Sequence, residues 1–551
     1  MKRNNIIHII SATLVCGGML FTESCDESEF LNRYPLDSPS PDVFFVNEAA
    51  ARMAVTAAYE PWRRSSNSYL RDLVIMNDAI SDDAYWRPSR AASISFSQWK
   101  INSSDGTANN YWNFAFQSIN SANFAIKNIP KLLDKGLTQA QIDPYIGEAH
   151  FLRGFAYMFL TSYFGDVPLH DQPRESFEEF EQPRTAVADI YDQIIADFTL
   201  ARETLPDKQP AAYTGAATKA TAAAYLAKAY LYNKEWALAE TAGRTAVNIA
   251  EAAGYELLES FEDIFTHENE GNKELLFYLQ FIDNSRDFGN NYMIQRITRN
   301  APPEFIHVYG MAGWGYALPM RDLFDAFEPG DPRREATIHY PGAVYGTYSA
   351  GGSFTYSHRT YDAGGKLVTY QKTYNDGDPI DYDYRWSETG MNVKKCTRNV
   401  AHLQDVYSDG LDVPLMRMAD LYLILAEALA EQNKDEALVW VNKVRARPSV
   451  NMPPKTITDG TLRDIVRHER RVELAMEGQR IFDLLRWGIM KQTFGNNLKV
   501  KKHFFSDYLT DQFTRFAQPE LAKYPGESVL LPIPQTEIDR NSKITTNNPG
   551  Y

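Results

Sequence analysis

Apolar residues recur at three- and four-residue spacing along much of the chain, which is the pattern of helices that bury one face. An alanine-rich run from Asn47 to Tyr59 predicts the first helix of the body, and we expect Pro61 to stop it. Segments 111–129 and 144–164 carry the same periodicity. The pattern predicts a mainly helical protein.

Two segments show the alternation of small and large residues that is typical of tetratricopeptide helix pairs. In segment 218–250, Tyr230, Ala239 and Ala246 stand at the separations that such a pair uses for its interlocking side chains. A second pair is predicted over 421–447, with a turn one residue shorter than the consensus. Because one pair cannot cover its own apolar face, we expect further pairs with more degenerate sequences.

The stretch 340–386 differs from its surroundings, with 11 aromatic residues and 7 glycines but few aliphatic residues. The run from Tyr361 to Lys366 has the composition of a hairpin turn. A second loop-rich, aromatic stretch covers 61–112. We therefore predict an α-helical scaffold of tetratricopeptide-like pairs, decorated by long loops and short β-hairpins, and either stretch could line a ligand surface.

The N-terminus has the features of an export signal. Lys2 and Arg3 precede a mostly apolar stretch over 6–20, which is too short and too interrupted to span a bilayer as a mature helix. Ser24 supplies the small residue needed just before a cleavage at Cys25. We therefore predict that residues 1 to 24 are a lipoprotein signal peptide and that Cys25 is lipidated. A soluble secreted protein that is cut nearby is the alternative.

Segment 25–41 is polar and contains three prolines, so we expect it to be a lipidated tether that leads into the body. Each buried methylene of an acyl chain contributes about 0.8 kcal/mol, and several chains would therefore anchor a soluble body durably.

Charge and cysteine content exclude two classes of protein. The chain has 71 acidic and 56 basic residues, and this formal net charge of −15 disfavours binding to nucleic acid. Two of the three cysteines, Cys16 and Cys25, lie in the first 25 residues, so no disulfide framework can hold the fold together. We expect the third, Cys396, to be an inert core thiol.

The sequence has no nucleophile elbow, no HExxH motif, no phosphate loop and no paired-cysteine metal site. Gly313-Trp314-Gly315 begins like a dinucleotide-binding fingerprint, but Leu318 stands where its third glycine is needed. The adjacent carboxylates Asp82 and Asp83 do not provide the facing geometry of a glycosidase. We therefore predict no catalytic residues, no cofactor and no metal ligands.

Four stretches follow one another in order, spread over nearly the whole mature chain. They are RGFAY at 153–157 with YFGDVPL at 163–169, MRMADLYLILAEAL at 416–429, IVRHERRVELAMEGQRIFDLLRWG at 465–488, and LLPIPQTEIDRNSKITTNNPGY at 530–551. Together they resemble the SusD/RagB family of nutrient-binding outer-membrane lipoproteins. The resemblance implies a SusD-like N-terminal helical part over 42–270 and a SusD/RagB C-terminal part over 271–551, which includes the aromatic loop region.

The resemblance implies a receptor that captures an oligosaccharide and delivers it, as a hinged lid, to a SusC-like TonB-dependent transporter. The acidic residues Asp26, Glu27 and Glu29 resemble an export tag for the outer face of the outer membrane. A peptide-binding RagB-like receptor is the first alternative. An exported glycan-degrading enzyme and a purely structural scaffold protein are the others.

Sugars present hydroxyl groups at their edges and C–H groups on their faces, so their binders need flat aromatic rings and a few fixed polar groups. Our ligand-site hypothesis is Trp86 beside Tyr85 and Arg87, together with Trp314 and Tyr316 in a glycine-flanked turn. A structural role for both tryptophans is the alternative. The aromatic stretch offers three further candidates, which also suit a contact with the transporter: Tyr348, Tyr356 and Tyr374.

Segment 465–488 carries Glu469, Glu473 and Glu477 at four-residue spacing beside several arginines. This spacing predicts that one helix carries a solvated ladder of ion pairs. We interpret the ladder as scaffold and not as a catalytic set.

Overall fold

The computed structural model describes residues 41–63, 71–86, 99–173, 179, 181–287, 289–361, 366–405, 407–497 and 529–551. The predicted signal peptide, the lipidation site Cys25, nearly all of the tether and Arg87 lie outside these residues. Within the described residues, no helix is both long enough and apolar enough to cross a bilayer.

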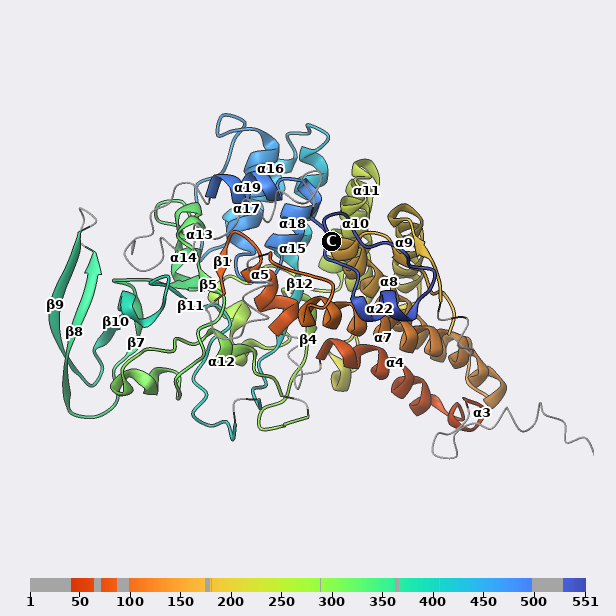
Figure 1. The fold of residues 1–551 in the computed structure, drawn as a ribbon, viewed down its shortest axis with the longest axis horizontal. Helices are drawn as coiled ribbons and strands as arrows, with labels where there is room; N and C mark the ends of the chain where they lie inside the picture. The colour runs from red at the N-terminus through yellow and green to blue at the C-terminus, as the bar shows by residue number, and fades with distance from the viewer. Residues whose placement is uncertain are drawn as a thin grey trace, which may run out of the picture.

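Helices build most of the molecule (Figure 1). The first half contains α3 (Pro41–Phe44), α4 (Glu48–Arg63), α5 (Asn77–Ala79), α7 (Gly106–Asn128), α8 (Gln139–Phe164), α9 (Val187–Thr204), α10 (Lys219–Tyr232) and α11 (Trp236–Ala252). The second half contains α12 (Tyr292–Arg296), α13 (Arg321–Ala326), α14 (Pro332–Thr337), α15 (Met418–Ala430), α16 (Ala437–Arg445), α17 (Leu462–Glu473), α18 (Arg480–Trp487), α19 (Met490–Asn497) and α22 (Gln535–Arg540).

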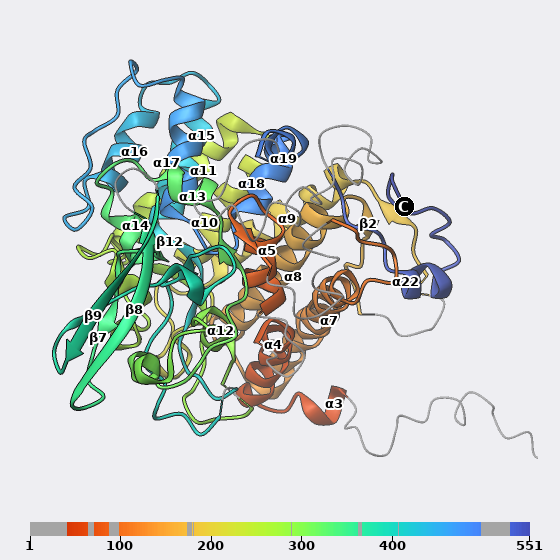
Figure 2. The same cartoon turned by 60° about the vertical axis from the view of Figure 1, so that its left-hand side comes forward.

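The long helices pack in a continuous series in which α4, α7, α8, α9, α10, α11, α15 and α16 each contact the next. Figure 2 shows α4, α7 and α8 running beside one another at one side of this series. Both predicted tetratricopeptide-like pairs are confirmed, as α10 with α11 and as α15 with α16. Ala239 and Ala246 are fully buried, as their small size at a helix contact requires. Before α10, α4 contacts α7 and α8 contacts α9, so helices that could form the expected further pairs are present.

Glycines allow α8 and α9 to pack closely. A Cβ atom on Gly154 would lie 3.0 Å from the ring of Phe198, and one on Gly147 would lie 2.4 Å from Oγ1 of Thr204. A Cβ atom at Gly147 would force the side chain of Thr204 to shift, and one at Gly154 would be an unusually tight contact, so both glycines favour the close approach of the two helices. The N-terminus of α8 is closed by a capping box of Thr138 with Gln141.

The prediction that Pro61 stops the first helix is wrong, because α4 runs on to Arg63. Proline removes one helical hydrogen bond close to the C-terminus, but Trp62 gains more from burial. Its ring packs against Phe155 at 4.6 Å between centroids, and its Nε1 donates to Oγ of Ser118 at 2.8 Å. Tertiary packing therefore extends the helix past its local stop signal.

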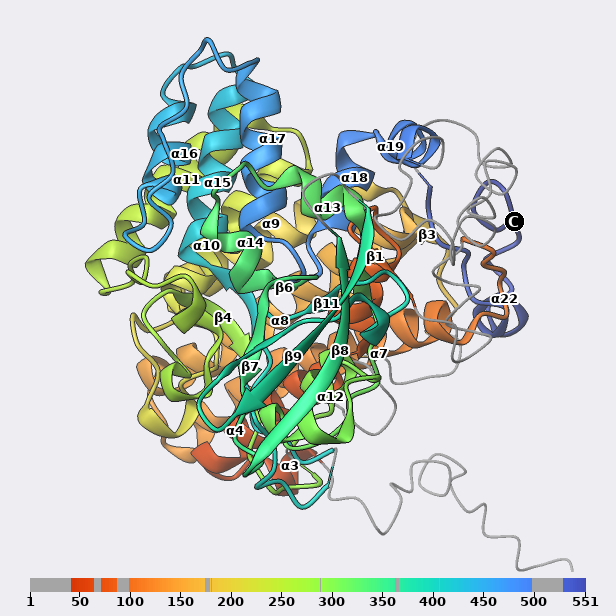
Figure 3. The same ribbon diagram turned by 90° about the vertical axis from the view of Figure 1, so that its left-hand side faces the viewer.

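The described strands pair two by two, all antiparallel, and all but the nine-residue β8 and β9 are short. The pairs are β1 (Ala84–Tyr85) with β5 (Leu318–Pro319), β2 (Val167–Pro168) with β3 (Arg184–Thr185), β4 (Leu275–Leu279) with β12 (Val413–Arg417), β6 (Ile338–His339) with β11 (Asn392–Val393), β7 (Val344–Thr347) with β10 (Pro379–Asp381), and β8 (Ser353–Tyr361) with β9 (Leu367–Asn375). Tyr361 pairs with Leu367, which confirms the predicted hairpin. Figure 3 shows β8 and β9 in front of the helical body.

The aromatic stretch forms a second hydrophobic core and not a set of open loops. Its centre is Phe305, whose ring lies 5.2 Å from Tyr374 and 5.8 Å from Trp386 between centroids. Tyr348 and Tyr374 are buried in this cluster. The half-buried Tyr356 accepts hydrogen bonds from Arg385 and Trp386 through its hydroxyl group. These three candidates therefore serve packing within the cluster.

The predicted single helix over 465–488 is also wrong, because the segment forms two helices, α17 and α18. Met476 and Gly478, between them, have φ angles of 62° and 72° in the left-handed region. That conformation is easy for glycine but ends a right-handed helix. The break turns the carboxylate of Glu477 toward Arg417 and Lys395.

The acidic ladder is buried, contrary to the prediction of solvated pairs. Glu469 and Glu473 are both completely buried. The guanidinium Nη1 of Arg333 donates to Glu469 at 2.5 Å and to Glu473 at 2.9 Å. Each charge is compensated by a partner from another element, so the set is an interior part of the scaffold.

Candidate ligand-binding site

A two-stranded ladder joins the two predicted aromatic segments, although they are far apart in the sequence. Tyr85 of β1 pairs with Leu318 of β5, and the backbone N–H of Met320 donates to the backbone carbonyl oxygen of Asp83 at 2.8 Å. This pairing sets Trp86 against the ring of Tyr316, with 4.6 Å between centroids and 22° between planes. The structure therefore brings together the two halves of the hypothesis.

The turn that carries Trp314 is attached to helix α12 by its backbone. The N–H groups of Trp314 and Tyr316 donate to the carbonyl oxygens of Ile294 and Gln295, at 2.9 and 2.7 Å. At Gly313 a Cβ atom would lie 2.0 Å from the carbonyl oxygen of Ile297, so no other residue fits. The glycine-rich sequence thus forms a tight support for an aromatic ring and not a phosphate-binding loop.

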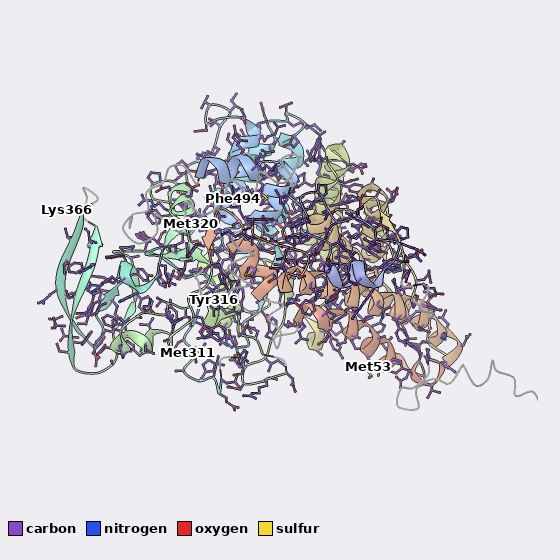
Figure 4. All side chains as sticks on the ribbon, in the orientation of Figure 1. Met53, Met311, Tyr316, Met320, Lys366 and Phe494 are labelled. Carbon is purple, nitrogen blue, oxygen red and sulfur yellow. The ribbon has the colours of Figure 1, made fainter. Side chains whose placement is uncertain are left out.

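The rings form a short series in which burial decreases toward the surface. Trp86 is 1% exposed and Tyr316 is 9% exposed. Trp314 is half-buried and lies 5.8 Å from Tyr316 between ring centroids. Figure 4 marks Tyr316 among the loops next to α12. Trp86 and Tyr316 form the buried end of the series, and Trp314 keeps part of its side chain exposed. Tyr85 is buried as well.

The carboxylates next to β1 hold it against helices α17 and α18. Nε of Arg480 donates to Asp82 at 2.7 Å, and Nε of Arg471 donates to Asp83 at 2.8 Å. Burial alone would raise the pKa of Asp82, but Arg471 and Arg480 outweigh it and hold that pKa below its ordinary value. Both acids are therefore anchors of the segment before Trp86.

The comparisons with known proteins match this architecture. A family model described as "SusD family" matches residues 273–551. The chain belongs to the SusD family. A second model, described as "Starch-binding associating with outer membrane", matches residues 30–231. The resemblance and the fold class predicted from the sequence are both confirmed.

Individual SusD-like proteins are similar over almost their whole length. The chain is 26% identical over 539 residues to SusD-like protein P2 of Formosa agariphila, covering 95% of this chain and 96% of that protein. A SusD-like carbohydrate binding protein from Bacteroides fragilis has a TM-score of 0.67 at 25% identity, covering 91% of this chain and 99% of that one. A laminarin binding SusD-like protein has a TM-score of 0.70 at 24% identity, covering 92% and 100%. SusD-family proteins bind their ligands and are not enzymes, in line with the prediction from the sequence.

In this SusD-family chain, Tyr407 also belongs to the candidate site around Trp314, and the sequence analysis did not identify it. Its side chain is 42% exposed, and its ring lies 6.3 Å from Trp314 between centroids, at 66° between planes. The residue stands in a short turn whose backbone N–H at Tyr407 donates to Asp405. A lone tyrosine in a polar turn gives no sequence signal, because only the fold places it beside Trp314.

The one group of possible metal ligands found among the described residues, and the described cysteine, both serve the structure. Glu328, His468 and Glu469 offer ligand atoms within 4.8 Å of one another. However, Arg445 bridges the two glutamates, and Nε2 of His468 is 2.8 Å from the carbonyl oxygen of Ala326. Burial raises the pKa of the Cys396 thiol to about 11, as expected for an unreactive core cysteine.

Proposed function

We propose that this protein is a surface-exposed lipoprotein that captures an oligosaccharide and delivers it to a SusC-like TonB-dependent transporter as its lid. The capture surface consists of Trp314 and Tyr407, backed by Tyr316 and Trp86. The observation that carries the proposal is the exposed end of the ring series, where two aromatic side chains from different loops meet at 6.3 Å.

The geometry suits a sugar because aromatic rings at an angle can contact two faces or two neighbouring rings of a glycan. Rings held by buried neighbours lose little side-chain entropy on binding, so more of the contact energy appears as affinity. The family description as starch-binding and the carbohydrate binding of the Bacteroides fragilis relative support the same class of ligand. No activated nucleophile is needed for capture and release.

Replacing Trp314 and Tyr407 together with alanine is expected to weaken oligosaccharide binding at least tenfold, which is about 1.4 kcal/mol. Isothermal titration calorimetry with hexasaccharides from starch and laminarin measures the change. Tyr213→Ala is the matched control, because Tyr213 is also 42% exposed but lies elsewhere, over Arg52. Unchanged affinity in the double variant, or an equal loss in the control, would exclude this surface.

If a lipid on Cys25 anchors the protein, replacing this residue should change where the protein is found without affecting the fold of residues 42–551. Cys25→Ala should release the mature protein from the outer-membrane fraction, and it should reduce co-purification with a TonB-dependent transporter from solubilised membranes. Cys396→Ala is the control, because that buried thiol is far from any cleavage site in the sequence. Membrane retention of the Cys25 variant would contradict the lipoprotein assignment.

A further inference from the structure

Helix α7 has an unusual composition for a helix with a solvent-exposed face. Of its 23 residues only Lys127 is charged, whereas α17 carries seven charged residues among twelve. Between Gly106 and Lys127, which are exposed near its two ends, its exposed positions are filled by Asn113, Gln117 and Asn120. Asparagine is a poorer helix former than lysine, arginine or glutamate, so these choices do not optimise helix stability.

The three amides share one face of the helix. Their spacing of four and three residues places them in a row along the helix axis. Within the described part of the chain, no hydrogen bond of these three side-chain amides is found. Each amide therefore presents two donors and one acceptor to whatever lies against the helix.

Aromatic rings alternate with the amides on the same face. Phe116 and Phe124 are both half-buried, and Phe116 packs against Trp112 with 4.8 Å between ring centroids. These rings are fixed from behind by the core, because Trp112 in turn contacts Phe164 at 5.2 Å. The face thus combines rigid apolar patches with unused hydrogen-bonding groups.

Two hollows adjoin along this face and share Asn120. One has a volume of about 270 Å³ and is walled on its far side by His170 and Glu537. The other has a volume of about 410 Å³ and is walled by Phe44 and Met53. We call the two hollows together the α7 groove. From residue 112 to residue 124 the helix rises about 18 Å, which is long enough for several sugar rings in a row.

The chemistry of the α7 groove selects among ligand classes. The lining residues that the structure describes include the carboxylate of Glu537 but no lysine or arginine, so among them a phosphate, sulfate or uronate group would find neither side chain to pair with. Amides and flat rings match a ligand with many hydroxyl groups and apolar C–H faces. The lining therefore favours a neutral oligosaccharide.

We infer that the α7 groove is a second carbohydrate-binding site, for an extended neutral oligosaccharide. It is separate from the Trp314 and Tyr407 surface: Figure 4 shows Met53, at one end of the groove, well away from Tyr316. The inference rests on the proposed function, since it requires that the protein bind glycans. Two sites on one body would hold a long glycan more strongly than either site alone.

The test removes the amides and keeps the helix. In the triple variant Asn113→Ala, Gln117→Ala, Asn120→Ala, each replacement is a better helix former, so the thermal midpoint should stay equal or rise. The control is Thr241→Ala with Thr245→Ala on α11, where both exposed hydroxyls bond only to their own helix. Calorimetry with starch and laminarin hexasaccharides gives the number of ligands bound per chain, and affinity gels that contain the parent polysaccharides give retention.

The wild type and the α11 control should bind two hexasaccharides per chain, and the triple variant should bind one, with weaker retention on the polysaccharide. The double variant at Trp314 and Tyr407 should also bind one hexasaccharide per chain, in the α7 groove. If the wild type binds one ligand and the triple variant is unchanged, the α7 groove is not a glycan site, but the proposed function stands. If the wild type binds none of these glycans, the proposed function fails, and this inference fails with it.

Discussion

Replacing Arg417 with leucine is expected to lower the free energy of unfolding by about 3–5 kcal/mol, which is the cost of breaking a buried ion pair by removing one partner. Arg417 is buried at the end of β12. Its guanidinium donates to Glu274 at 2.9 Å, to Glu473 at 2.7 Å and to Glu477 at 2.9 Å. Leucine would take one cationic partner away from each of these three interior carboxylates, leaving Arg447, Arg333 and Lys395 beside them.

Chemical denaturation of the variant and the wild type measures this loss. The matched control is Arg244→Leu, since Arg244 also pairs with two glutamates, Glu240 and Glu436, but at the surface. Exposed pairs of this kind are worth about 0–1 kcal/mol. A loss of the same small size at Arg417 would mean that the interior network is already relaxed or hydrated.

Acid pH provides a second measurement on the same network. Burial alone would raise the pKa of Glu473, but Arg417, Arg447 and Arg333 outweigh it and hold that pKa far below its ordinary value of 4.5. The stability that this carboxylate contributes is therefore present above pH 4.5 and is lost as the pH falls toward its folded pKa. In Arg417→Leu the same pKa should rise, so the difference between the two proteins should be largest near neutral pH and shrink below about pH 4.5. A difference that does not vary with pH would contradict this account.

Features that depend on short stretches of sequence could be predicted. The pair α10 and α11 was expected from small residues at fixed spacing, because that spacing alone decides which positions meet across two adjacent helices. The hairpin that pairs Tyr361 with Leu367 could be predicted from the turn-forming composition of segment 361–366. Pro61 shows the limit, since the burial of Trp62 overrode a correct local signal.

Features that depend on distant partners could only be predicted in part. The residue types at Trp86 and Trp314 pointed to one aromatic site, and the structure does bring them together through Tyr316. The sequence cannot show how deeply each ring lies, because that depends on the pairing of β1 with β5. Tyr407 joins the same cluster from a turn that has no distinguishing pattern.

The buried charges illustrate the same limit. Periodicity showed that Glu469 and Glu473 share a helix face, but not that this face points inward. A helix face that carries charged side chains is normally exposed to solvent. An acidic face can be buried only where positively charged side chains from other elements pair with it. Arg333 and Arg417 supply that match from α14 and β12. No window of sequence contains both the acids and these partners.

Replacing Arg471 with leucine is expected to disturb both the stability and the ligand surface. Nη2 of Arg471 lies 3.1 Å from Asp82 and 2.7 Å from Asp83, and both aspartates are buried. The free energy of unfolding should fall by about 3 kcal/mol, at the lower end for a broken buried pair, because Arg480 still neutralises part of the charge.

We expect Arg471→Leu to weaken oligosaccharide binding because it would move Trp86 out of place. Without Arg471, Asp83 would lose its arginine partner while Asp82 kept Arg480. Repulsion between the two adjacent carboxylates would displace β1, and Trp86 would then no longer support Tyr316 beneath Trp314. Calorimetry at a temperature where the variant is fully folded should show at least tenfold weaker binding, while the α7 groove keeps its ligand.

A rescue variant separates charge from packing. Adding Asp82→Asn and Asp83→Asn to Arg471→Leu removes the repulsion without restoring the guanidinium, so stability and affinity should both recover in part. If stability recovers but affinity does not, the ion pairs orient the ring series as well as holding β1 in place. If the single variant keeps full affinity, Trp86 does not support the ligand surface, because that surface then tolerates a displaced β1.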